Sequence, residues 1–231
     1  MENYVSRRES SSVAVPTLLK SVYMQMAAAL SVTGLVAYFL SESQSFWYFM
    51  EQNQFMFWGV LIAQLALVII MSACINRLSM TAATLLFILY SVLMGVTMSS
   101  IFLVYTMSSI ASTFFITAGT FLVMSILGFV TRIDLSRMGS ILFMALIGLI
   151  IATIVNIFVA SGTLQVIINY AGVLIFVGLT AYDTQKIKEM VYEYGSADEM
   201  GHKLALLGAL TLYLDFINLF LYLLRILGDR R

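Results

Sequence analysis

The sequence predicts an all-α membrane protein, a polytopic bundle of seven transmembrane helices. Of its 231 residues, 61% are hydrophobic and only 10% are charged, whereas a soluble globular domain carries about 25% charged residues. So few charged side chains cannot cover a surface that faces water, so lipid must be the solvent for most of it. One span needs about 20 apolar residues, and the chain therefore has room for the spans and no separate soluble domain.

Apolar runs separated by short polar segments can be marked along the whole chain. Each run is continuously apolar, whereas the strands of a membrane barrel alternate with a period of two, so the runs are predicted to be helices. The predicted spans are Leu18–Leu40, Phe55–Ile75, Met80–Tyr105, Ile110–Val130, Met138–Ala160, Leu164–Gln185 and Leu204–Leu224. The segment Lys186–Tyr194 contains neither Gly nor Pro, and we expect the sixth helix to continue through it.

The polar segments of the chain, and the Lys and Arg residues in them, indicate its orientation in the membrane. Residues 1–16 are polar and rich in Ser, which predicts a flexible tail before a transmembrane domain at 17–231. A cleaved signal peptide is the alternative, but the apolar stretch that follows reaches Leu40 and is too long for one. With the N-terminus in the cytoplasm, nine of the twelve Lys and Arg residues lie in inner segments, as the positive-inside rule requires. The remaining three follow the seventh run, so the side of the C-terminus stays open.

Several residue counts limit the chemistry that this chain can perform. A single cysteine, Cys74, excludes an intrachain disulfide and a cysteine metal cluster, and a single histidine, His202, excludes a multi-histidine metal site. We expect no tightly bound cofactor. The net charge of +0 gives no electrostatic reason to bind nucleic acid. Ser91, Gly95 and Ser99, spaced by four, predict a close helix–helix contact.

Two aspartates interrupt the last two apolar runs. Asp183 lies near the inner end of the sixth run, and Asp215 lies in the middle of the seventh. A carboxylate at the bilayer centre costs at least about 2.5–3.5 kcal/mol, so such a residue faces protein or water and is a functional-site candidate. The seventh run also carries a polar stripe at helical spacing, which we expect to face the bundle interior. Its members are Thr211, Asp215, Asn218 and Tyr222.

If the sixth helix continues into the cytosol, Asp183 and Asp215 come level and can pair. Two buried carboxylates close together cannot both ionise cheaply, so the pair would share a proton and act as a proton-sensitive switch. When ionised, the same oxygens suit a hard cation such as Ca²⁺, so both residues are also candidate transient metal ligands. The structural alternative is that each aspartate only caps or bridges helices.

Arg77 ends the second run at the inner face, where it either latches Asp183 or serves as a positive-inside anchor.

The segments around the two aspartates resemble the transmembrane BAX inhibitor-1 motif family, most closely its bacterial members. The resemblance is carried by Val177–Lys186, Leu210–Phe220 and Leu223–Gly228. It implies six helices around a central seventh helix, a bacterial inner-membrane location, and a pH-sensitive Ca²⁺ leak controlled by a pair of aspartates. Asp183 and Asp215 stand at the positions of that pair. Arg77, eighteen residues before Gly95, matches the arginine that latches the first aspartate in bacterial relatives. The family also implies cytoprotective or stress-response roles.

The leading hypothesis is therefore a pH-sensitive calcium leak channel that closes at neutral to alkaline pH. A second hypothesis is a membrane-embedded regulator that binds other membrane proteins, such as a quality-control protease, without transporting anything itself. A third is an intramembrane aspartyl protease. Its second motif, Gly-x-Gly-Asp, reads Leu-Tyr-Leu-Asp at 212–215, and its Pro-Ala-Leu motif is missing because Pro16 is the only proline. We therefore expect no enzymatic activity.

Overall fold

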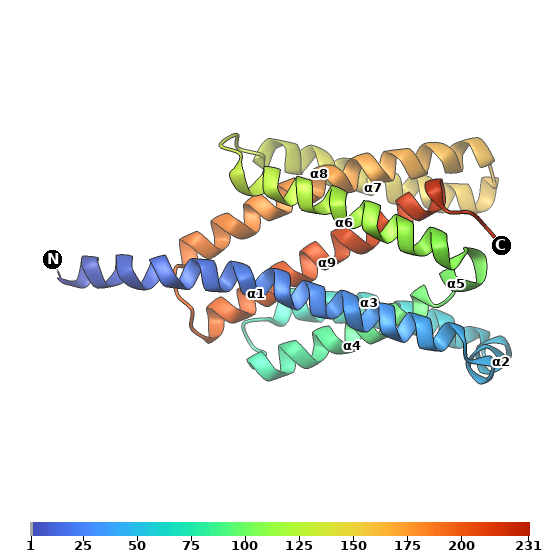
Figure 1. Cartoon of the computed structure of the whole chain (residues 1–231), viewed down its shortest axis with the longest axis horizontal. Helices are drawn as coiled ribbons and strands as arrows, with labels where there is room; N and C mark the ends of the chain where they lie inside the picture. The colour runs from blue at the N-terminus through green and yellow to red at the C-terminus, as the bar shows by residue number, and fades with distance from the viewer. Residues whose placement is uncertain (1) are drawn as a thin grey trace. The chain divides into compact units, whose positions relative to one another are not determined.

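The computed structural model describes the backbone of residues 2–231 and the side chains of residues 15–53 and 55–231. Figure 1 shows the order of the helices by colour, from α1 in blue to α9 in orange and red. The helices are α1 Glu2–Ser41, α2 Gln44–Gln52, α3 Gln54–Cys74, α4 Met80–Met98, α5 Ile101–Val104, α6 Met107–Val130, α7 Ser136–Val159, α8 Gly162–Tyr194 and α9 Glu199–Leu227.

Seven stretches among the described residues are long and apolar enough to cross a membrane, which confirms the predicted fold class and the number of spans. They are Val15–Ser41, Phe55–Cys74, Met80–Val104, Met107–Val130, Ser136–Val159, Gly162–Tyr194 and Glu199–Leu227. The last has the largest buried share, 67% of its most apolar window. A central position for this seventh span stays a prediction. Helix α1 begins at Glu2, inside the segment predicted as a flexible tail. The flexibility of that segment also stays a prediction.

Local sequence sets the ends of the helices. Ser43, Ser79 and Thr106 precede α2, α4 and α6, and each side-chain oxygen accepts a hydrogen bond from a backbone N–H in the first turn. Helix α8 continues to Tyr194, as expected, and stops where Gly195 adopts a positive φ of 64°. The third apolar run is interrupted between α4 and α5 at Ser99 and Ser100. Both hydroxyls there donate to backbone carbonyls three residues earlier, which offers the chain an alternative to continuous helix.

The chain forms two compact units, and the first comprises residues 1–104, 190–213 and 231. In this unit α4 packs against α1 and α3. A Cβ added at Gly95 would lie 2.6 Å from the Cβ of Val36, so the predicted close approach is real, and it joins α4 to α1. Thr33 Oγ1 donates to the carbonyl of Ser91 at 2.9 Å and lies 2.7 Å from the hydroxyl of Tyr213. A buried polar network therefore reinforces the contact between α1 and α4.

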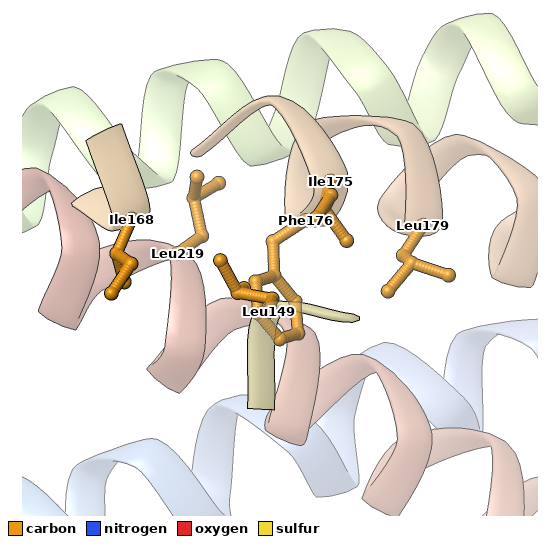
Figure 2. Close-up of a cluster of buried hydrophobic side chains, with 6 residues drawn as sticks. All are labelled: Leu149, Ile168, Ile175, Phe176, Leu179 and Leu219. Carbon is orange, nitrogen blue, oxygen red and sulfur yellow. The ribbon is translucent and has the colours of Figure 1, made fainter. Parts of the chain in front are cut away.

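The second unit comprises residues 105–189 and 214–230, and in it α6, α7 and α8 run alongside one another (Figure 1). Its core is built by α7, α8 and the second half of α9. Figure 2 shows this cluster, to which α7 contributes Leu149, α8 contributes Phe176 and α9 contributes Leu219. The other members are Ile168, Ile175 and Leu179. Leu219 is fully buried there, so the apolar side of α9 is fixed against α8.

The end of the chain is tied to the start of α6. Asp229 donates its backbone N–H to Ser109 Oγ at 3.0 Å, and Ser109 Oγ donates to the Asp229 carboxylate at 3.3 Å. The backbone N–H of Thr106 donates to the carbonyl of Asp229. Asp229 therefore lies beside Thr106–Ser109, the segment between the third and fourth spans.

Asp198 begins α9 and provides a pH-dependent contribution to its stability. Its Oδ1 accepts the backbone N–H of Gly201 at 2.9 Å, and both carboxylate oxygens accept from the Tyr194 hydroxyl. These hydrogen bonds, the one from Gly201 first, lower the pKa of Asp198 below its usual range. A lowered pKa means that the stabilisation is present above the pKa of the unfolded chain and is lost as the pH falls through the folded value.

We therefore expect amide protection at the start of α9 to fall as the medium is acidified below about pH 4, the ordinary pKa of an aspartate. Hydrogen exchange, expressed as protection factors at several pH values, measures this. Asp198→Asn keeps a good N-cap residue but does not titrate, so its protection should depend less on pH than that of the wild type. Glu199 in the same turn, whose pKa is also lowered by its hydrogen bonds with Lys203 and the backbone of Met80, accounts for the dependence that remains. Equal pH dependence in the variant and the wild type would contradict the assignment.

Candidate functional site

Within the second unit, the structure places the carboxyl groups of Asp183 and Asp215 next to each other. Asp183 comes from α8 and Asp215 from α9. Asp215 is 5% exposed, and Asp183 is partly buried. An ionised carboxylate only accepts hydrogen bonds, so a hydrogen bond between two carboxyl groups requires a proton on one of them. The two carboxyl groups therefore lie close together, as the sequence predicts, and a proton shared between them stays a prediction.

Helix α8 is held closely at the level of Asp183. A Cβ on Gly128 of α6 would collide with the backbone carbonyl of Ala181, so the two helices touch backbone to backbone. A Cβ on Gly139 of α7 would collide with the ring of Tyr182, so α7 lies close to the side chain of this residue. Thr184 Oγ1 donates to Ser125 Oγ at 3.3 Å. Neighbours on both sides of Asp183 are thus in contact with α6 and α7, which fixes the position of its carboxyl group.

The loop before α7 is attached to the same stretch of α8. Gln185 Nε2 donates to the carbonyl of Ile133 at 2.9 Å, and Gln185 Oε1 accepts the backbone N–H of Leu135 at 2.8 Å. Lys188 Nζ donates to the carbonyl of Phe129 at 2.7 Å and lies 5.0 Å from the centre of the Phe129 ring. The loop and the helix that carries Asp183 therefore move together.

Aromatic packing holds α9 at the level of Asp215. Phe216, the next residue, makes edge-to-face contacts with Phe114 and Phe121 of α6, each with ring centres 5.5 Å apart. Further along, the ring of Tyr222 stacks on Phe176 of α8 and lies directly over Gly172, where a Cβ would come within 2.6 Å of it. These contacts on both flanks leave Asp215 facing α8.

The other members of the predicted polar stripe bond elsewhere. Asn218 Nδ2 donates to the carbonyl of Leu214, one turn back in its own helix, and Tyr222 lies near Thr153 of α7. Thr211 belongs to the first unit and donates to the carbonyl of Leu207. Among the stripe residues that the structure describes in the second unit, Asp215 is the one in contact with Asp183. Supporting roles for Thr211, Asn218 and Tyr222 stay predictions.

Lys186, which the sequence analysis did not select, is a positive charge close to Asp183 in the second unit. It lies three residues after Asp183, attracts that carboxylate, and its Nζ is 5.7 Å from the centre of the Tyr182 ring. The spacing of Lys186 from Asp183 could have identified it, because residues three apart share a helix face.

Arg77 lies exposed in the turn after α3, in the first unit. The latch between Arg77 and Asp183 stays a prediction.

Ca²⁺ takes 6–8 oxygen ligands, and the pair supplies two carboxyl groups. Among the described residues, no group of three or more Asp, Glu, His or Cys side chains gathers to hold a metal. Asn156, a polar residue inside the fifth span, makes structural hydrogen bonds. Its Nδ2 donates to Gln165 at 3.1 Å, and its Oδ1 accepts the backbone N–H of Ser161 across the turn from α7 to α8. An ion at the aspartate pair would therefore need water or backbone carbonyls to complete its shell.

Seven apolar helices and an acid pair inside the last two of them define a polytopic α-helical membrane protein with a buried protonatable site. Residues 15–231 match the family described as "Inhibitor of apoptosis-promoting Bax1", and the chain belongs to this family. It is 51% identical over 216 residues to the inner membrane protein YbhL of Escherichia coli (strain K12), covering 93% of this chain and 92% of that one. It is 47% identical over 213 residues to a protein of Borreliella burgdorferi, covering 92% of each chain.

Proposed function

We propose that this protein is a pH-sensitive calcium leak channel of the bacterial inner membrane, with its N-terminus in the cytoplasm. The observation that carries the proposal is the contact between Asp183 and Asp215, two carboxyl groups from different membrane-spanning helices. Ionisable residues inside spans mark ion pathways and proton relays. The membrane is proposed from the relative in Escherichia coli, which is named an inner membrane protein.

In the proposed mechanism, the singly protonated pair carries one negative charge that holds cationic side chains close to it. Lys186 already lies beside Asp183, and Arg77 is the second proposed partner. At neutral to alkaline pH this attraction keeps the inner mouth closed. A second proton removes the negative charge and with it the attraction, so the leak should increase as the pH falls.

Replacing both aspartates by asparagine tests this mechanism. The amides of Asp183→Asn/Asp215→Asn can still bond to each other, but they do not titrate, so Ca²⁺ flux into liposomes should lose its pH dependence. The measurement is flux from an external Ca²⁺ pulse at several pH values. Asp134→Asn is the matched control, because Asp134 is an exposed acid in the loop before α7. If the double variant keeps the wild-type pH profile, the pair does not control the leak.

A second candidate function is a regulator that binds other membrane proteins, for example in quality control or a stress response. It is favoured by the description of the family, which refers to inhibition of another protein. Chemical crosslinking in membranes distinguishes the two candidates. A single stoichiometric partner together with no flux in liposomes would favour the regulator. We propose no enzymatic activity for either candidate, because the residues before Asp215 are Leu-Tyr-Leu.

A further inference from the structure

A short amphipathic helix, α2, lies between the first two spans. On a helix with about 3.6 residues per turn, its side chains divide into two faces. The apolar face carries Phe46, Trp47, Phe49 and Met50, and the polar face carries Gln44, Ser45, Tyr48, Glu51 and Gln52. Every residue of α2 keeps part of its surface uncovered. Phe49 is 47% exposed on the apolar face, so the protein does not supply a full cover for that face.

The position of α2 along the chain fixes its depth. The first span ends at Ser41 and the second begins at Phe55, so α2 lies at the level where spans meet water. The indole N–H of Trp47 donates to the carbonyl of Ser41 at 3.1 Å, which ties α2 to the end of α1. At the start of the second span, Phe55 is 91% and Trp58 64% exposed. The apolar face of α2, which the protein covers only in part, is therefore continuous in sequence with exposed aromatic residues of a membrane span.

The charge of the segment indicates which lipid surface it fits. Residues 21–76 contain no Lys or Arg, and their two acidic residues are Glu42, just before α2, and Glu51, within it. Interfacial helices that depend on anionic lipids carry Lys and Arg on the polar face, and this one cannot. Trp and Tyr are enriched at the boundary between membrane and water, where an apolar ring and a polar edge are both satisfied. Burial of apolar surface must therefore supply the binding energy.

We propose that α2 lies in the membrane interface, with its aromatic face inserted among the headgroups and upper acyl chains of neutral, zwitterionic lipids. The helix lies parallel to the membrane, and Glu51 on the opposite face stays in water. Helices of this kind insert about 5–10 Å into the boundary between headgroups and acyl chains. The proposal concerns the lipid surface and is independent of the proposed channel activity.

The two tryptophans of the chain, Trp47 and Trp58, both lie in this region, so tryptophan fluorescence reports on it alone. In Trp58→Phe protein, reconstituted in phosphatidylcholine vesicles, Trp47 is the sole emitter. We expect a spin label high on the acyl chain to quench Trp47 more than a label near the chain end, and acrylamide in water to quench it weakly. Added anionic lipid or salt should leave the ratio unchanged. In Trp47→Phe protein, Trp58 serves as a marker for a folded second span.

A pair of charge-changing variants tests which face is inserted. In the Trp58→Phe background, Phe49→Glu should shift Trp47 emission to the red and increase quenching by acrylamide. Gln52→Glu makes a similar charge change on the polar face and should leave both unchanged. Three outcomes would overturn the proposal: strong acrylamide quenching of Trp47 before any change, shielding from both lipid labels and acrylamide as at a contact with a second copy, or a quenching ratio that depends on anionic lipid.

Discussion

Gly128→Ala is expected to destabilise the protein strongly, although alanine is the better helix former. The added Cβ collides with the backbone carbonyl of Ala181, and a backbone atom cannot swing away as the end of a side chain can. Overpacking costs about 1–3 kcal/mol and occasionally more, and we expect the upper part of that range because α6 and α8 must separate. The gain in helix propensity offsets only about 1 kcal/mol. Thermal unfolding in detergent measures the difference.

Gly119→Ala is the matched control for this substitution. Gly119 lies on the same helix, α6, and a Cβ there meets no atom within 4 Å. It should leave the unfolding temperature unchanged or raise it. The separation of helices in Gly128→Ala also displaces Ala181, two residues before Asp183. If the two variants unfold at the same temperature, α6 and α8 are not in backbone contact.

The second large effect concerns the aspartate pair and does not depend on transport. Asp183→Ala should leave Asp215 buried without its partner, and Asp215 Oδ2 already has no hydrogen-bond partner among the described residues. Leaving a buried polar group unsatisfied costs about 1–3 kcal/mol. Removing both carboxyl groups abolishes that penalty, so Asp183→Ala/Asp215→Ala should cost less than the sum of the single variants. We expect a coupling energy of about 0.5–3 kcal/mol, as for other residues in direct contact.

Unfolding of the four proteins of this double-mutant cycle, at one pH near neutrality, gives the coupling energy. A second cycle that combines Asp183→Ala with Asp134→Ala is the control. Asp134 is exposed in the loop before α7, where it accepts the backbone N–H of Ser136 at 2.8 Å. Independent sites add within about 0.3–0.5 kcal/mol. Additivity in the cycle of Asp183 and Asp215 would contradict their contact.

Hydropathy predicts the spans well because lipid imposes one strong requirement on every exposed position. Every predicted run corresponds to a span, and the extension of α8 to Tyr194 follows from the lack of Gly and Pro before Gly195. The same dependence on hydropathy explains why the short helices were missed, because they are not long apolar runs. Glu42–Gln54 reads as a polar loop by hydropathy, but Ser43 caps a helix there with one apolar face. The break between α4 and α5 depends on serine hydroxyls that bond locally.

The site was predictable in part. Asp183 and Asp215 attract attention because charge is rare inside a span, and the helix extension brings them level. The contacts that position them carry no comparable signal. Gln185 holds the backbone of the loop before α7, and Gly128 lies against Ala181. Each depends on where distant segments meet, which a single sequence does not record. Lys186 could have been found from its spacing to Asp183 alone.

The division of α9 between the two units has a consequence for biosynthesis. Residues up to Tyr213 belong to the first unit and those from Leu214 to the second, and the last residues tie down the start of α6. Both units include a part of α9, so neither is complete until this helix has been synthesised. Spans inserted earlier therefore remain in the bilayer without their contacts to α9 until it is inserted. A stop codon before Leu214 would deprive the second unit of its α9 segment, including Asp215 and the residues that anchor α6.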